Sequence, residues 1–68
     1  MKDLAKRLGE NIKVKRKEKG LAQDKFAELA DIDRSYLGRI ERGQVNITVE
    51  KLYALTKILD CHARDLLP

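Results

Sequence analysis

The chain has 68 residues, of which 15 are Lys or Arg and 11 are Asp or Glu, so its net charge is +4 and its pI is about 9.4. This length allows one small domain over residues 1–68, and no apolar run approaches the roughly 20 residues that a membrane span needs. A single cysteine excludes an internal disulfide framework and favours a reducing cytoplasm. Helix-forming residues dominate, which predicts an all-α fold, and the positive charge favours a polyanionic partner.

The first predicted helix covers residues 3–19 and ends at Gly20. Leu4, Leu8 and Ile12 lie four residues apart and should face the core. Its second half carries a cluster of lysines, Lys13, Lys15, Lys17 and Lys19. These lysines form either a solvated helix face or, for one or two of them, contacts to phosphate.

Residues 23–42, with the sequence QDKFAELADIDRSYLGRIER, predict two short helices joined by a tight turn. The apolar residues at helical spacing are Phe26, Ala27 and Ala30 in the first helix and Leu37 and Ile40 in the second. Ile32 should fill the gap between the helices, and Asp31 suits the left-handed conformation of such a corner. Asp33 is expected to cap the second helix with its carboxylate. The polar residues or glycine left over on that helix are Arg34, Ser35, Gly38, Arg39 and Arg42.

These two helices belong to a longer pattern that extends over nearly the whole chain. In order, it consists of Ile12, Arg16, Gly20, Leu21, Gln23, Phe26-Ala27, the Ile-Glu-Arg-Gly run at residues 40–43, Asn46, Thr48, Leu52 and the pair Leu66-Leu67. In this order and spacing, the pattern resembles the helix-turn-helix of the phage repressor and Cro type, found in the Xre-like family of regulators. The resemblance implies a compact five-helix bundle that binds double-stranded DNA.

Two interactions follow from the resemblance. Arg16 shares a helix face with Leu8 and Ile12, and a half-buried arginine needs a carboxylate partner. In the family this arginine pairs with the glutamate two residues before the closing glycine, which is Glu41 here. Gln23 occupies the place of a glutamine that donates to a DNA phosphate and braces a base-contacting side chain; solvent exposure is the alternative.

The resemblance also implies that the helix at residues 34–42 enters the major groove. Arg34 and Arg39 can each bind guanine O6 and N7 with two hydrogen bonds, and Ser35 can bind a phosphate or a base. Tyr36 is a candidate for stacking on the DNA backbone or touching a thymine methyl group, with packing on the domain as the alternative.

The remaining segments are a loop and two further helices. In the loop, Gln44 and Asn46 are candidates for neutral hydrogen bonds to phosphate, with an intra-loop turn bond as the alternative for Asn46. Thr48 should cap a fourth helix at residues 49–59, and a short fifth helix is expected at residues 63–67.

These observations predict a sequence-specific transcriptional regulator, either a repressor or an activator, that binds a palindromic operator as a homodimer. The candidate interface residues, each of which could instead pack in the core, are Ile47, Tyr53, Leu66 and Leu67. An antitoxin or another protein-interaction module that neutralises a partner is the alternative function.

An enzyme is not expected, because the chain has one His, one Cys and no carboxylate pair, glycine-rich phosphate loop or metal-ligand spacing. Cys61 and His62 are adjacent but lack further ligands nearby, so no metal or other cofactor is expected. No small-molecule ligand is expected either, since 68 residues leave no room for a sensor domain.

Overall fold

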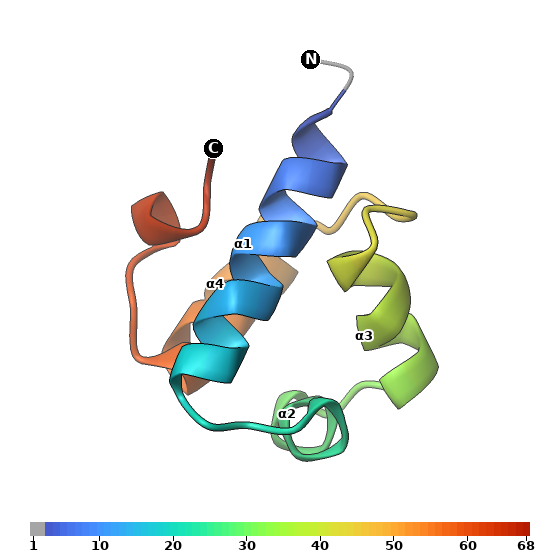
Figure 1. Ribbon diagram of the computed structural model, residues 1–68, viewed down its shortest axis with the longest axis vertical. Helices are drawn as coiled ribbons and strands as arrows, with labels where there is room; N and C mark the ends of the chain where they lie inside the picture. Colours follow the sequence, from blue (N-terminus) through green and yellow to red (C-terminus); the bar gives the residue numbers. More distant parts are fainter. Residues whose placement is uncertain (1–2) are drawn as a thin grey trace.

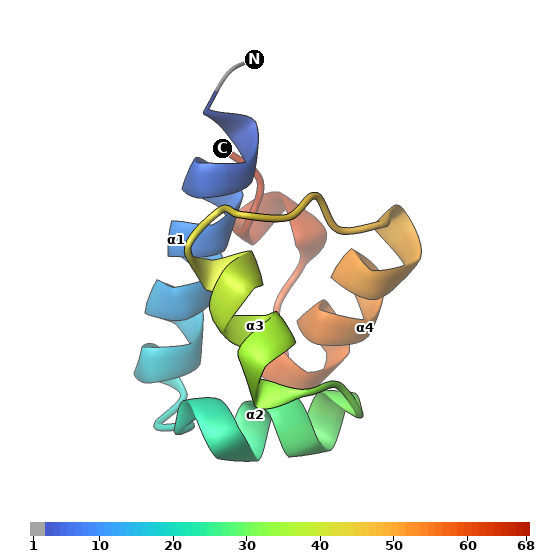
Figure 2. The same cartoon turned by 90° about the vertical axis from the view of Figure 1, so that its right-hand side faces the viewer.

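The computed structural model describes residues 3–68 as an all-helical domain, which confirms the predicted fold class. Its elements are α1 (Leu4–Glu18), α2 (Gln23–Ala30), α3 (Arg34–Glu41), α4 (Val49–Leu59) and the 3-10 turn η1 (Ala63–Asp65). Helices α1 and α4 run along the long axis, α2 lies across one end, and α3 packs beside α1 on the side opposite η1 (Figures 1 and 2).

The prediction of a fifth α-helix is wrong in type and length, because the described residues form four α-helices and a 3-10 turn rather than a five-helix bundle. The tighter winding of a 3-10 turn explains this difference. Its N–H groups bond to the carbonyl three residues earlier, as Leu66 N does to Ala63 O at 3.0 Å. This turn directs Leu66 into the core, where it is fully buried. Asn11 fixes the segment to α1 by donating from Nδ2 to Leu66 O at 2.7 Å.

The core receives fully buried side chains from all four α-helices and from the C-terminal turn. They are Ile12, Phe26, Leu37, Ile40, Leu55, Leu59 and Leu66. Leu8 is partly buried against this core, as its helical spacing predicts. The expectation for Leu4 is wrong: 43% of its surface is exposed, because the first turn of α1 extends beyond the other helices (Figure 1).

The ends of the helices follow local signals with one exception. Gly20 has φ +72° after α1, and Asp31 has the predicted left-handed conformation (φ 57°, ψ 45°) between α2 and α3. Thr48 Oγ1 accepts from Lys51 N at 3.0 Å and caps α4 as expected. Asp33 precedes α3 in an extended conformation, but the predicted capping bond is wrong, since its exposed carboxylate accepts no backbone N–H.

A close approach of two helix backbones sets the position of α3. Gly9 in α1 lies against the C-terminal end of α3, and a Cβ atom at this position would collide with the carbonyl oxygens of Ile40 and Glu41. Gly43, with φ +73°, lies equally close to the backbone of Lys6. The absence of side chains at these two positions lets α3 lie directly on α1 with its opposite face in solvent.

Candidate nucleic-acid interface

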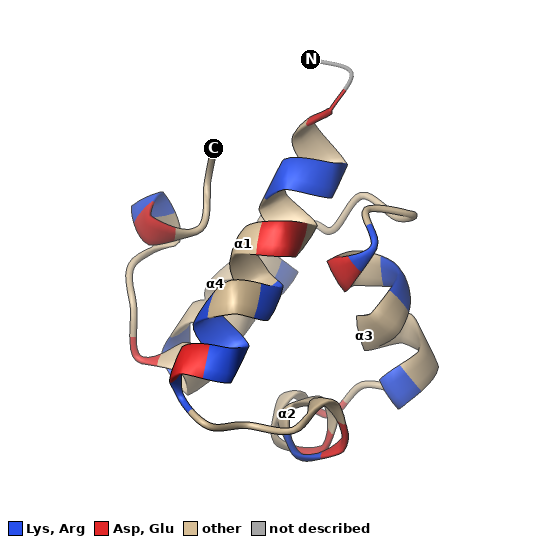
Figure 3. Ribbon diagram, viewed as in Figure 1, with Lys and Arg blue, Asp and Glu red and all other residues tan. Residues whose placement is uncertain are grey.

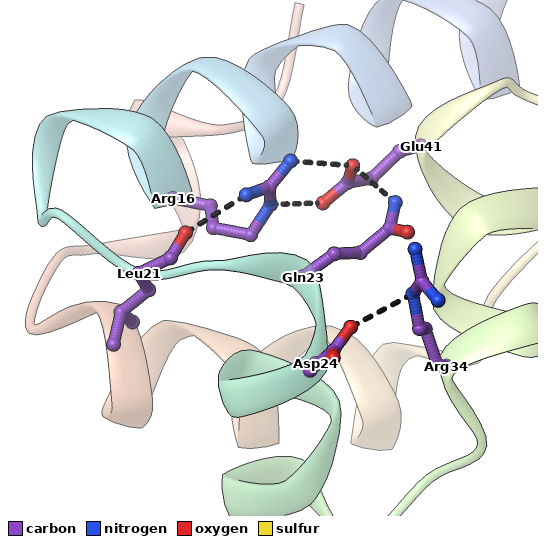
Figure 4. Close-up of polar contacts among 6 residues, drawn as sticks. All are labelled: Arg16, Leu21, Gln23, Asp24, Arg34 and Glu41. Carbon is purple, nitrogen blue, oxygen red and sulfur yellow. Dashed lines mark hydrogen bonds and ion pairs between the residues drawn. The ribbon is translucent and has the colours of Figure 1, made fainter.

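A buried polar network connects α1, α2 and α3 (Figure 4). Arg16 donates from Nε to Glu41 Oε2 at 2.7 Å and from Nη2 to Glu41 Oε1 at 3.1 Å, and only 7% and 6% of the two residues are exposed. Arg16 Nη1 also donates to Leu21 O at 2.8 Å. Gln23 joins the network by donating from Nε2 to Glu41 Oε1 at 3.0 Å. The start of α2 is therefore tied to the end of α3 through one carboxylate.

Above this network lies a surface cleft of about 410 Å³ between α2 and α3. Its lining residues are Gln23, Arg34, Ser35, Gly38, Arg39 and Arg42. Every charged residue among them is an arginine, and all three arginines come from α3 or from the residue that follows it (Figure 3). The structure thus brings four predicted DNA-binding residues together in one basic cleft, along with Arg42, which was not among the predicted binding residues.

Arg34 has a second interaction at the edge of this cleft. Its Nε lies 2.8 Å from Asp24 Oδ1, and the side chains are 68% and 76% exposed. Figure 4 shows the two residues extending toward each other from α3 and α2. Sequence spacing does not reveal this pair, because its members lie ten residues apart on different helices. The available signal was an acid in the first turn of α2 and an arginine that begins α3.

Tyr36 lies apart from the basic cleft. It is partly buried against the core, and Arg39 Cζ lies 5.6 Å from the centre of its ring. Tyr36 and Arg39 also line a second cleft of about 600 Å³, whose other charged residues are Glu28, Asp31 and Asp33. The arginine-lined cleft is the better match for a polyanion, and the cation–π contact steadies Arg39 between the two clefts.

The two loop residues predicted to contact phosphate are both exposed. Gln44 Oε1 accepts from Arg42 Nη2 at 3.4 Å, which places Gln44 near the end of the basic cleft. Asn46 lies two residues farther along the connection to α4, which passes over the top of the view in Figure 2.

A second exposed surface lies on α4. Val49 and Tyr53 are one helical turn apart and are 69% and 55% exposed. Of the two alternatives for Leu66, the structure shows core packing, since this residue is fully buried, whereas Leu67 is 46% exposed. Ile47 is partly buried against the core.

Cys61 and His62 belong to the C-terminal turn. Partial burial, reinforced by Asp65, raises the pKa of the Cys61 thiol. The N–H of His62 donates to Asp65 Oδ2 at 2.9 Å, and this bond lowers the pKa of Asp65. Within residues 3–68, no group of three or more His, Cys, Asp or Glu side chains is placed to hold a metal ion. In the same part of the chain, no helix combines the length and apolar character needed to cross a bilayer.

Comparison with known proteins agrees with this geometry. The family model HTH_3, described as helix-turn-helix, matches residues 12–66. The chain belongs to the helix-turn-helix family. The family prediction is confirmed, as is the prediction of a DNA-binding transcriptional regulator rather than an enzyme.

Three regulators illustrate which known proteins this helix-turn-helix chain resembles. The control protein C.SmaI of Serratia marcescens is 34% identical over 65 residues, which cover 96% of this chain and 77% of C.SmaI. The restriction-modification controller protein C.AhdI of Aeromonas hydrophila is 39% identical, with a TM-score of 0.87 over 98% of this chain and all of C.AhdI.

The third relative is the transcriptional regulator SinR of Bacillus subtilis, 39% identical over 61 residues, which are 88% of this chain and 55% of SinR. A crystal structure of the biofilm regulator SinR in complex with DNA superposes with a TM-score of 0.81 and 38% identity, over 87% of this chain and 95% of the SinR chain. The helix-turn-helix chain therefore spans about half the length of full SinR and almost all of the part seen with DNA.

Proposed function

We propose that this helix-turn-helix regulator binds double-stranded DNA with α3 in the major groove and recognises base sequence there. The basic cleft between α2 and α3 carries this proposal. It lies on the face of α3 opposite the core and is lined by Arg34, Arg39 and Arg42. A charged, concave surface along an exposed helix suits the phosphates and base edges of a duplex.

The predicted binding residues that remain at or near this cleft have roles that their chemistry allows. Arg34 and Arg39 bind guanine O6 and N7, and Ser35 binds a base or a phosphate. Gln23 gives one Nε2 N–H to Glu41 and keeps the other for a phosphate. Gln44 and Asn46 bind phosphate along the loop. Phosphate contacts supply most of the affinity and make it fall with salt, while base contacts supply discrimination.

The test is selection of bound fragments from a random-sequence duplex pool, repeated over a series of salt concentrations. We expect an enriched motif whose guanine preference Arg39→Ala relaxes by about 5- to 150-fold. Arg64→Ala is the matched control, because it removes the same charge from η1, on the far side of α1 from α3 (Figure 1). Steep salt dependence without any enriched motif would reduce the proposal to nonspecific attraction by a basic surface.

The regulator acts as a homodimer on two half-sites in the cytoplasm. The exposed Val49 and Tyr53 supply an apolar patch on α4 where a second copy can bury both side chains. Leu67 is also exposed and is a further candidate, because the family resemblance implies a dimer formed through the last helices. Two recognition helices about one turn of DNA apart then bind a palindrome.

Sedimentation of the free protein tests this assembly. We expect wild type to sediment as a dimer at micromolar concentration, Tyr53→Asp as a monomer, and Leu29→Asp as a dimer. Leu29 is a matched control because it is 49% exposed and lies on α2. A wild-type monomer at high micromolar concentration would contradict the homodimer.

A further inference from the structure

The ion pair between Asp24 and Arg34 involves one particular nitrogen of the guanidinium group. The nitrogen next to Asp24 Oδ1 is Nε, at 2.8 Å. Arg16 provides a contrast in the same region, since it commits Nε and Nη2 to Glu41 and Nη1 to Leu21 O. The ion pair thus lies at the side of the Arg34 guanidinium group, and the end that carries both Nη atoms faces away from Asp24 (Figure 4).

The two Nη atoms suffice for a bidentate contact to a base. A bidentate contact to guanine uses two parallel N–H donors directed at O6 and N7. Because the Asp24 carboxylate lies beside Nε, Arg34 can bind guanine through both Nη atoms without leaving Asp24. A flexible arginine that is restrained before binding also loses less side-chain freedom when it binds.

The charge of Asp24 has a second consequence. A carboxylate at the edge of the basic cleft repels nearby phosphates, which lowers the affinity for every sequence alike. Its contribution to guanine binding acts only where a guanine faces Arg34. Asp24 therefore weakens nonspecific DNA binding and strengthens specific binding, which widens the difference between the two affinities.

We propose that Asp24 is a positioning residue that determines the base preference of this regulator by holding Arg34 through Nε and presenting both Nη atoms to a guanine. The proposal rests on the proposed function, since it requires α3 in the major groove. It adds a specificity determinant from α2, a helix that itself touches no base in this arrangement.

The experiment selects bound fragments from a random duplex pool with wild type, Arg34→Ala, Asp24→Ala, Asp24→Asn and Glu28→Ala, with thermal melting of each variant as a check on folding. Glu28 is the matched control because it is an exposed acid of the same helix and pairs with Lys25 at 3.5 Å instead of an arginine of α3. Asp24→Asn removes the charge and retains a side-chain oxygen that can accept a hydrogen bond from Nε.

We expect Arg34→Ala to relax one guanine position of the wild-type motif, and Asp24→Ala to lower the preference at that same position by about three- to tenfold. Asp24→Asn should keep most of the preference, and Glu28→Ala all of it, while all three acid-removing variants bind random DNA more tightly. Equal relaxation by Asp24→Asn and Asp24→Ala would assign the effect to charge and overturn the positioning role.

Two further outcomes separate this inference from the proposed function. If wild type enriches a motif and Asp24→Ala retains its guanine preference, or Arg34→Ala relaxes no position, the inference fails and sequence recognition by α3 stands. If wild type enriches no motif at any salt concentration, both proposals fail together.

Discussion

Replacing Glu41 with alanine tests the buried network that joins three helices. Three hydrogen bonds end on this carboxylate, from Arg16 Nε at 2.7 Å, Arg16 Nη2 at 3.1 Å and Gln23 Nε2 at 3.0 Å. Glu41→Ala leaves the Arg16 guanidinium, in a residue only 7% exposed, with the carbonyl oxygen of Leu21 as its remaining partner.

Removing one member of a buried ion pair costs about 3–5 kcal/mol of unfolding free energy, because the other charge stays buried without compensation. A domain of this size has a total stability of roughly 3–10 kcal/mol, at about 0.05–0.15 kcal/mol per residue. The substitution therefore removes a large part of the stability, and the melting temperature should fall by at least about 10 °C.

Urea denaturation followed by circular dichroism measures this loss. Glu18→Ala is the control, since Glu18 pairs with Lys15 at 3.1 Å on the surface and such pairs contribute about 0–1 kcal/mol. The double variant Arg16→Met/Glu41→Leu should recover most of the stability, because it leaves no unpaired charge. Glu41→Ala with the urea midpoint of wild type would refute the reasoning.

Gly9→Ala should destabilise the fold by about 1–3 kcal/mol, because its Cβ meets the backbone of α3, which cannot yield as a side chain does. Gly38→Ala should instead stabilise it by up to about 1 kcal/mol, since its Cβ would meet the movable guanidinium of Arg42 at 3.0 Å; urea midpoints that shift in one direction for both would contradict this contrast. Thr48→Ala should lower the free energy of unfolding, measured by thermal melting, by about 1 kcal/mol. Asp33→Ala should lower it clearly less, because Thr48 makes a capping bond and Asp33 does not. The backbone N–H of His62 lowers the pKa of Asp65 below 3.8. The ionised Asp65 therefore stabilises the fold above about pH 4, and this stabilisation is lost as the pH falls through the pKa of Asp65 in the folded protein. The stability difference between wild type and Asp65→Asn should accordingly shrink in acid titration, and a difference that stays constant down to pH 2 would count against it.

The local conformation of this chain was determined by the sequence alone. Helical spacing of apolar residues predicted α1 to α4, and Gly20, Asp31 and Thr48 predicted where helices end or begin. Such signals act within a few residues, so they need no knowledge of the fold. The missing capping bond of Asp33 shows the limit of this reasoning, because the residue type at an N-cap does not fix whether its side chain turns back toward the helix.

The contacts between helices were decided only by the tertiary structure. Arg16 and Glu41, 25 residues apart, could be paired only through resemblance to a family. Which of Leu66 and Leu67 is buried depends on how η1 turns, and the need for glycine at position 9 depends on how closely α3 lies against α1. The pair of Asp24 and Arg34 likewise depends on the distance between α2 and α3 across their turn. Sequence periodicity specifies one face of each helix, whereas the distance and rotation between two helices arise from the packing of all their side chains at once.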